Sequence, residues 1–486
     1  MSQTSVYDVA IIGGGVVGCA IARELSRFRL RVVLLERQEE VGFGTSKTNS
    51  GIIHAGHHSS PATLKGRLVV RGNALFDELE RDLGFGFRRV GELVVAREPA
   101  EIEVLEKLRA QGEGKAIQGL ELWDAERLRR EEPNLSNKLV AALHAPTAGV
   151  INPYELVFAL MENARANGVE LRVNSPVCGI EPVDGMLRVR IQSGALVSRF
   201  VLNCAGVFAD QIAALAGASG FTIRPRKGEE YMLDKRLHGL VRRIIFPVPG
   251  KHSKGILIIP TYDGTIMVGP TAEDTEDRYD LSTSERGAEQ VFSFIRQICP
   301  SITERDTITE FAGLRAVADS DDFVISPAGP RGFINVAGIQ SPGLTASPAI
   351  AEYLRDLLRD QGLELRERDD FEPRVPGPHR FASLSVKQRA ELIAADRRFA
   401  RVVCRCELVT EAEVHRAVDR GARTLDGIKF RTRAGMGRCQ GGFCTTRCMN
   451  ILSQRLGVPF EQVTKRGGGS WVVAPLSGPQ HPKAGE

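Results

Sequence analysis

The stretch Tyr7-Asp8-Val9-Ala10-Ile11-Ile12-Gly13-Gly14-Gly15-Val16-Val17-Gly18 decides the fold of most of this chain. Its apolar half predicts a buried strand, and its glycines predict a tight turn into an amphipathic helix from Cys19 to Arg29. Gly13 permits the turn, Gly15 lets the backbone approach a pyrophosphate, and Gly18 lets the helix pack closely on the strand. The start of the helix offers free N–H groups to phosphates.

A second apolar strand, Arg31-Val32-Val33-Leu34-Leu35, ends at Glu36. A carboxylate about twenty residues after the glycine turn can accept hydrogen bonds from a ribose. Strand, turn, helix, strand and acidic residue in this order predict a Rossmann-like dinucleotide site. A purely structural glycine turn is the alternative, and the glycines alone do not distinguish FAD from NAD.

A run of small and polar residues from Gly42 to Gly56 comes next. Such a run cannot form an ordinary apolar core, but it suits a backbone that wraps around a ligand. Later motifs follow in a fixed order along the chain. They are Asn203-Cys204-Ala205-Gly206-Val207-Phe208-Ala209-Asp210, Phe311-Ala312-Gly313-Leu314-Arg315 and Gly338-Ile339-Gln340-Ser341-Pro342-Gly343-Leu344-Thr345.

Together these pieces resemble the flavoprotein family that contains D-amino-acid oxidase, L-2-hydroxyglutarate dehydrogenase and glycerol-3-phosphate dehydrogenase. The resemblance implies FAD as the tightly held cofactor, with the late glycine segment closing over the flavin and its helix N-terminus supplying positive potential. The residues it implies at the FAD site are Gly13, Gly15, Gly18, Glu36, Thr45, Ser46, Gly51, Ile52, Ala205, Gly206, Gly343, Leu344 and Thr345.

The length of 486 residues allows two large cores and a small module, because single cores stop growing near about 250–300 residues. We expect an α/β protein whose FAD-binding domain carries a mixed-sheet substrate lobe, with a small helical cysteine-rich domain at the end. Gly91–Val95 and Gly255–Pro260 look like strands of the lobe, and Tyr262-Asp263-Gly264 predicts a hairpin turn. The expected boundaries are an oxidoreductase body at 1–360 (FAD-binding parts about 1–80, 146–221 and 311–360; substrate lobe about 81–145 and 222–310), a linker at 361–398, a [2Fe-2S] module at 399–465 and a flexible tail at 466–486.

His54 is the candidate base, because oxidation of an alcohol needs a group that takes the hydroxyl proton while hydride leaves the carbon. A histidine that only hydrogen-bonds the flavin or its own loop is the alternative. Arg315 resembles the arginine that family members aim at the phosphate or carboxylate of the substrate, and a structural ion pair is the alternative. Lys254 and Lys227 are weaker candidates, for which a solvated surface charge is the expectation.

Four of the nine cysteines form two pairs, Cys404-x-Cys406 and Cys439-x4-Cys444, separated by 32 residues. Thr410 and Glu413 form a capping box that opens a helix through about Asp419, and a second helix runs from about Cys444 to Leu456. The pairs thus lie beside helix ends, where thiolates are stabilised.

This segment resembles the bacterioferritin-associated-ferredoxin type of [2Fe-2S] module, which also occurs at the C-terminal end of anaerobic glycerol-3-phosphate dehydrogenase. The resemblance makes Cys404, Cys406, Cys439 and Cys444 the ligands, with nearby glycines letting backbone N–H groups approach the sulfides. A structural zinc site or an empty module is the alternative. Cys448 is expected to be a bystander, and buried structural thiols are expected at the isolated Cys19, Cys178, Cys204 and Cys299.

A net charge of +4 from scattered basic residues argues against nucleic acid as a partner. The sequence contains no uninterrupted stretch of about 18 apolar residues, the length that predicts a transmembrane helix. We therefore expect a cytoplasmic protein, at most attached peripherally to the inner face of a membrane. The expected partners are a small anionic hydroxy substrate, an electron-acceptor protein or quinone, and an additional subunit docking on the cysteine module.

The combined motifs predict an FAD-dependent dehydrogenase that oxidises glycerol 3-phosphate to dihydroxyacetone phosphate and passes electrons through the [2Fe-2S] cluster. Two features favour L-2-hydroxyglutarate instead: Arg315 is followed by Ala316-Val317 rather than Pro-Leu, and the run from His57 to Lys65 resembles L-2-hydroxyglutarate dehydrogenases. An amino-acid or amine dehydrogenase and a non-catalytic electron-transfer subunit are further alternatives.

Overall fold

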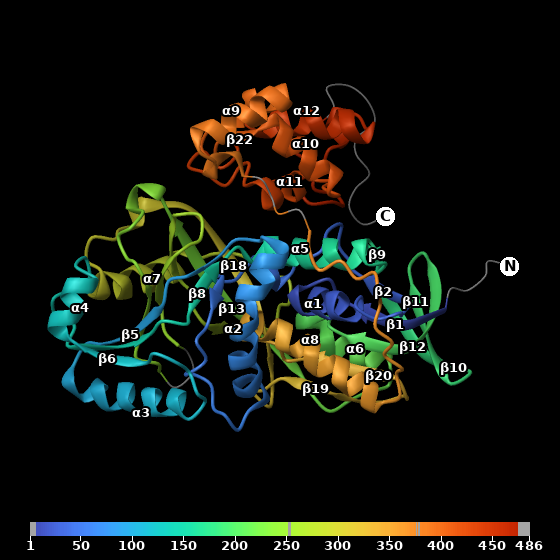
Figure 1. Cartoon of the computed structure of the whole chain (residues 1–486), viewed down its shortest axis with the longest axis horizontal. Helices are drawn as coiled ribbons and strands as arrows, with labels where there is room; N and C mark the ends of the chain where they lie inside the picture. Colours follow the sequence, from blue (N-terminus) through green and yellow to red (C-terminus); the bar gives the residue numbers. More distant parts are fainter. Residues whose placement is uncertain (1–5, 251–253, 376, 378–379, 475–486) are drawn as a thin grey trace. The chain divides into compact units, whose positions relative to one another are not determined.

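The computed structural model describes residues 6–250, 254–375, 377 and 380–474 (Figure 1). The chain forms two compact units, one ending at Val375 and one beginning after it. The first unit contains two large sheets with their helices, and the second is small and mainly helical.

The first sheet has eight strands, with β1 at its centre. β1 pairs in parallel with β2 and β12, so that Ile12, Leu35 and Asn203 lie side by side where the three strands end. Ligands of open α/β sheets bind at this edge. The strands run in the order β10-β11-β12-β1-β2-β9, with β20 beside β12 and β19 beside β20. Their bounds are β1 Val6–Ile12, β2 Val32–Leu35, β9 Glu170–Arg172, β10 Val177–Val183, β11 Met186–Ile191, β12 Gly194–Asn203, β19 Val324–Pro327 and β20 Phe333–Ala337.

The helices of this domain are α1 Val16–Leu25, α2 Leu64–Leu83, α5 Pro153–Ala166, α6 Ala209–Leu215 and α8 Gly343–Asp360, and α1 packs against both α5 and α8. The helix predicted from Cys19 to Arg29 begins and ends earlier. It starts at Val16 because Gly15 is its N-cap. It stops at Leu25 because the chain then turns, and Phe28 bridges to Glu367.

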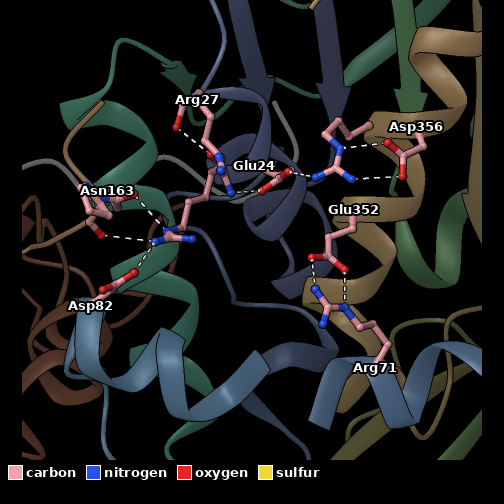
Figure 2. A network of polar contacts seen from close by, with 11 residues as sticks. Glu24, Arg27, Arg71, Asp82, Asn163, Glu352 and Asp356 are labelled. Atoms are coloured by element: carbon pink, nitrogen blue, oxygen red, sulfur yellow. Dashed lines mark hydrogen bonds and ion pairs between the residues drawn. The ribbon is translucent and has the colours of Figure 1, made fainter. Parts of the chain in front are cut away.

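A network of charged side chains links these helices (Figure 2). From α1, Arg23 reaches Asn163 of α5 at 3.0 Å and Asp82 of α2 at 3.4 Å. Glu24, its neighbour, pairs with Arg355 of α8 at 2.7 Å. These contacts fix how α2, α5 and α8 pack on α1, and therefore where the first turn of α8 lies.

The second sheet has nine strands in the order β17-β13-β16-β15-β14-β5-β7-β6, with β18 beside β13. Separate apolar clusters, one containing Trp123 and Phe292 and the other Phe246 and Leu257, hold it together. The predicted hairpin is confirmed, since β15 and β16 pair antiparallel across the turn at 262–264. The strands are β5 Glu92–Ala96, β6 Glu121–Asp124, β7 Ala141–Ala145, β13 Ile223–Leu233, β14 Ile244–Pro247, β15 Leu257–Pro260, β16 Ile266–Gly269, β17 Glu273–Asp274 and β18 Thr307–Ala318, with helices α3 Ile102–Glu113, α4 Ala125–Glu131 and α7 Glu285–Ile298.

The expected boundary between residues 310 and 311 falls inside β18. That strand pairs with β13 along its length, so Arg315 belongs to the second sheet and not to the FAD-binding sheet. A small third sheet has the order β3-β8-β4, with β3 at Ile52–Ile53, β8 at Gly149–Ile151 and β4 at Phe87–Arg89. Short 3-10 helices lie at Thr45–Lys47, Pro99–Glu101, Gly206–Phe208, Lys235–Leu237, Glu304–Asp306, Phe381–Ser383, Arg397–Ala400 and Phe460–Gln462.

The second unit packs three helices around one apolar core that includes Cys404, Cys444 and Met449. Its elements are α9 Val386–Ala395, β21 Val402–Cys404, β22 Val409–Thr410, α10 Glu411–Asp419, α11 Leu425–Thr432 and α12 Thr445–Leu456. Both predicted helices are present, and the Thr410–Glu413 capping box forms. The segment expected to be a linker, 361–398, contains α9, which a Ser385–Gln388 capping box starts.

Of the tail predicted to be flexible, residues 475–486 lie outside the described part of the chain. Residues 466–474 are described, and Trp471 bridges to Thr464. Among the helices that the structure describes, none is both long and apolar enough to cross a bilayer.

Candidate active site

The glycine turn lies where β1, β2 and β12 end, and two of its glycines are required by close contacts. Gly13 has φ +107°, and a Cβ there would lie 2.5 Å from the carbonyl oxygen of Cys204. A Cβ on Gly18 would collide with the carbonyl oxygen of Gly13. The turn therefore accepts only glycine at these positions.

Groups that suit a dinucleotide surround this turn. The Glu36 carboxylate accepts a 2.7 Å hydrogen bond from Gly14 N, and Ser46 Oγ accepts one of 2.9 Å from Val16 N. The N-cap of α1 is Gly15, which has no side chain of its own, and the space beside Gly206, just after β12, is open. A helix start at a glycine turn, a carboxylate and open space fit a pyrophosphate and a ribose.

The loop after Glu36 and the start of α8 are joined through Thr345. Its Oγ1 accepts a 3.0 Å hydrogen bond from His54 N and lies 3.3 Å from the carbonyl oxygen of Ile52. Thr45 Oγ1 donates to the carbonyl oxygen of Leu314 at 2.7 Å. The structure thus brings together the predicted loop, the first turn of α8 with Gly343 and Leu344, and strand β18.

His54 is buried, and its two ring nitrogens face different groups. Nε2 lies 3.4 Å from Ser341 Oγ, and Nδ1 lies 4.0 Å from Glu92 Oε2. Burial, with further contributions from Lys254 and His57, holds the pKa of His54 well below its ordinary value. The imidazole is therefore neutral near pH 7, which is the form a general base needs.

Lys254 is not the solvated surface charge that the sequence suggested. Its Nζ lies 3.3 Å from Ser341 Oγ, and its charge interacts with the Glu92 carboxylate. Burial lowers the pKa of Lys254. Lys227 also differs from the expectation, because it is buried and pairs with Asp280 at 2.7 Å.

Arg315 makes no ion pair within the part of the chain that the structure describes. Its Nη2 donates to the carbonyl oxygen of Thr271 at 3.2 Å, while its buried Nη1 has no hydrogen-bond partner among the described residues. The guanidinium lies against Gly228, where a Cβ would come within 2.5 Å of Nη2. A buried guanidinium with a free N–H edge has the chemistry to bind an anion. Nearby Glu230 has its pKa raised to about 7 by burial.

The four cysteines of the second unit also converge. Cys406 Sγ lies 3.7 Å from Cys439 Sγ, and the Cys404 and Cys444 thiols contact each other. Backbone N–H groups point at these sulfurs, from Gly435 and Glu407 to Cys404, and from Phe443, Gly441 and Gly442 to Cys439. Four sulfurs with amide donors fit an iron-sulfur cluster.

Comparisons with known proteins agree with this geometry. The family model "FAD dependent oxidoreductase" matches residues 8–357, and "BFD-like [2Fe-2S] binding domain" matches residues 402–454. The chain belongs to the FAD-dependent oxidoreductase family. It is 43% identical over 477 residues to a glycerol 3-phosphate dehydrogenase of Caloramator mitchellensis, covering 98% of this chain and 99% of that protein.

Two further relatives cover the FAD-dependent oxidoreductase domain. The human mitochondrial L-2-hydroxyglutarate dehydrogenase is 28% identical over 415 residues, covering 73% of this chain and 89% of that protein. The structure of the FAD-bound L-α-glycerophosphate oxidase of Mycoplasma pneumoniae superposes with a TM-score of 0.73 at 30% identity, covering 76% of this chain and 98% of that one. This oxidoreductase therefore uses FAD and a [2Fe-2S] cluster, and the residues described above fit both groups.

Sequence reasoning did not single out Glu92 and used His57 only as part of a resemblance. Glu92 begins the strand Glu92–Ala96, all of which is buried, and its carboxylate is 0% exposed. An acidic residue directly before an apolar run is the signal that marks it. One further expectation is corrected: Cys178 is exposed on the surface, whereas Cys19, Cys204 and Cys299 are buried as predicted.

Proposed function

We propose that this protein oxidises glycerol 3-phosphate to dihydroxyacetone phosphate and passes the electrons through its [2Fe-2S] cluster to a quinone or a partner protein. One observation carries the proposal. The Ser341 hydroxyl lies 3.4 Å from His54 Nε2 and 3.3 Å from Lys254 Nζ, so a neutral base and a cation face one point. A small hydroxy anion needs both groups, since the base takes its hydroxyl proton and the cation binds its charge.

His54 is the proposed general base. Its neutral Nε2 takes the hydroxyl proton of the substrate as the C–O bond gains double-bond character and hydride leaves the same carbon. Bound FAD would supply the hydride acceptor. The loop keeps the imidazole in place because Thr345 accepts the backbone N–H of His54 and Asn73 donates to its carbonyl oxygen at 2.9 Å.

Lys254 and Arg315 are the proposed anion site. Each is within electrostatic range of the other, and the charge of Arg315 contributes to the lowered pKa of Lys254. Two like charges brought together in a buried site are unfavourable until a dianion binds between them, and a phosphate supplies two negative charges. Arg315 presents its free N–H edge to the anion, while Thr271 fixes its orientation.

The substrate itself is supported by the relatives named for glycerol 3-phosphate, one of which matches nearly the whole chain including the cysteine module. A [2Fe-2S] cluster on the same chain suits a dehydrogenase that transfers electrons one at a time to an acceptor. An oxidase transfers its electrons to oxygen and does not need such a cluster. L-2-Hydroxyglutarate is the second candidate, since the human relative is named for it and its carboxylates also suit Lys254 and Arg315.

Anaerobic bleaching of the flavin with glycerol 3-phosphate, L-2-hydroxyglutarate, L-lactate and amino acids tests the proposal. Glycerol 3-phosphate should reduce the flavin fastest, and the cluster should follow. His54→Asn should slow this reduction by at least about 100-fold, the usual scale for a general base. His144→Asn is the matched control, because His144 is a histidine of the second sheet that stacks on Trp123.

An unchanged reduction rate in His54→Asn would remove the base from the proposal. Faster bleaching by L-2-hydroxyglutarate would replace the substrate. No bleaching by any compound of the panel would favour an electron-transfer subunit without its own substrate.

A further inference from the structure

A buried carboxylate stands behind His54, on the side away from Ser341. Glu92 is the first residue of β5, where it lies between β14 and β7, opposite Ile244 and Ala145. Its Oε2 lies 4.0 Å from His54 Nδ1, and its Oε1 lies 3.3 Å from His57 Nδ1. Both carboxylate oxygens are buried and have no hydrogen-bond partner among the described residues.

The charged and titratable groups that face Glu92 are His54, His57, His58, Lys254 and, farther away, Lys115. Burial holds the pKa of each of the three histidines below its ordinary value, so they are neutral near pH 7. The ring of Phe246 packs 5.9 Å from His54 and 5.1 Å from His58. Burial raises the pKa of Glu92 to about 8, and the Lys254 ammonium opposes this shift by favouring the ionised form. Glu92 therefore becomes the charged carboxylate as the pH rises through about 8.

We propose that Glu92 is a positioning residue for His54. The carboxylate accepts the Nδ1 proton of His54, which leaves the lone pair of Nε2 facing the substrate, and it stabilises the imidazolium that forms when Nε2 takes the hydroxyl proton. This inference rests on the proposed role of His54 as base. The 4.0 Å separation is long for a hydrogen bond, as such contacts often are before substrate binds.

His54 and Glu92 together account for the protons of this step. The hydroxyl proton of the substrate goes to Nε2, the Nδ1 proton stays between His54 and Glu92, and the hydride leaves the carbon. The carbon–oxygen bond becomes a carbonyl, and bound FAD would be the oxidant that takes up the hydride. A buried carboxylate that fixes the tautomer of a histidine base is a recurrent arrangement, and removing its charge slows catalysis far more than it weakens binding.

The ligand atoms of His57, His58 and Glu92 also lie within 4.8 Å of one another, a spacing that a divalent cation could bridge. The positive charge of Lys254 beside Glu92 disfavours a cation there, so we argue for the positioning role and make a metal an outcome of the test.

The test is Glu92→Gln, which keeps the size of the side chain and removes its charge. Flavin reduction by saturating glycerol 3-phosphate, followed anaerobically by stopped flow, should slow by about 100- to 1000-fold, while the apparent Kd changes by less than about threefold. Reduction by dithionite should be unaffected. Glu132→Gln, which changes a buried glutamate at the end of α4 that pairs with Arg243 at 3.0 Å, is the control and should reduce at the wild-type rate.

A double variant separates positioning from a structural role. Once His54→Asn has removed the base, adding Glu92→Gln should cost less than about threefold more, because two residues that act as a unit are not additive. Equal losses in both backgrounds would overturn the inference, as would a wild-type rate in Glu92→Gln. If Glu92→Gln fails to hold FAD, Glu92→Asp keeps the charge and must retain more of the reduction rate than His54→Asn.

The outcome also distinguishes the inference from the proposed function. If the wild-type flavin is reduced only by L-2-hydroxyglutarate, the substrate assignment fails, and the same Glu92 variants are measured with that compound. If no hydroxy acid reduces the wild type, both fail. A divalent metal bound stoichiometrically to the wild type and lost from Glu92→Gln would replace the positioning role by a metal site.

Discussion

Gly228 leads to a prediction that follows from one interatomic distance. Gly228 and Arg315 lie on adjacent strands, where Arg226 is opposite Arg315 and Gly228 is two residues further along the same face. A Cβ at position 228 would lie 2.5 Å from Nη2 and 2.9 Å from Nη1 of Arg315. The guanidinium must therefore move away, and Gly228→Ala acts on the anion site without touching a charged residue.

The size of the effect follows from the contacts that are lost. A hydrogen bond to a charged group contributes about 1.5–3 kcal/mol. At about 1.4 kcal/mol for each tenfold change, the Kd for glycerol 3-phosphate should rise roughly 10- to 150-fold. The limiting rate of flavin reduction should change little, because His54 is unaffected.

The assay is the substrate dependence of flavin reduction in anaerobic stopped flow, together with thermal unfolding. Alanine is normally more stable than glycine in a strand by about 0.5–1 kcal/mol, so the melting temperature should not fall. Gly114→Ala, at the end of α3 where a Cβ would meet nothing closer than 3.4 Å, controls for the substitution itself. An unchanged Kd in Gly228→Ala would refute the placement of the substrate anion at Arg315.

Two further predictions concern charge and the cluster. Burial lowers the pKa of Lys254, so this residue loses its proton as the pH rises through a value below the ordinary lysine pKa of about 10.4. The KM for glycerol 3-phosphate should therefore rise at alkaline pH, and Lys254→Arg should remove this rise. A wild-type KM that stays constant up to about pH 10 would contradict the role of Lys254 in binding the substrate anion. Cys404→Ser should abolish the visible absorption and the iron content of the [2Fe-2S] cluster while FAD stays bound. Cys178→Ser, which changes an exposed cysteine, should keep the cluster and FAD. Iron retained in Cys404→Ser would show that Cys404 is not a ligand of the cluster.

Local patterns in the sequence were sufficient for the elements that build the cofactor sites. The apolar runs of β1 and β2, the glycine turn and the Thr410–Glu413 capping box each act within a few residues, so their structure follows from nearest neighbours. Helix α11 was not predicted. Its buried face includes Asp426, which pairs with Lys465 at 3.0 Å, so it lacks the continuous apolar stripe that marks a helix in a sequence.

The contacts among the proposed substrate-binding residues could not be predicted from such local patterns. A lysine is usually a surface residue. Only the pairing of β5 with β14 and of β14 with β15 brings the segment before β15, which contains Lys254, near Glu92. The two residues are far apart in sequence, and neither one predicts the other. The cost of burying a charge is met by its partner, so the burial of either residue depends on a contact that local sequence does not contain.

The amino-acid sequence by itself determined the cofactors of this protein, because glycine positions, a terminal carboxylate and cysteine spacing are requirements of the bound groups on short segments. The tertiary structure alone decided how His54, Glu92, Lys254 and Arg315 come together. These residues lie on a loop and three separate strands or strand ends, and their protonation is set by burial and by one another. Both depend on packing between distant parts of the chain, which no single segment encodes.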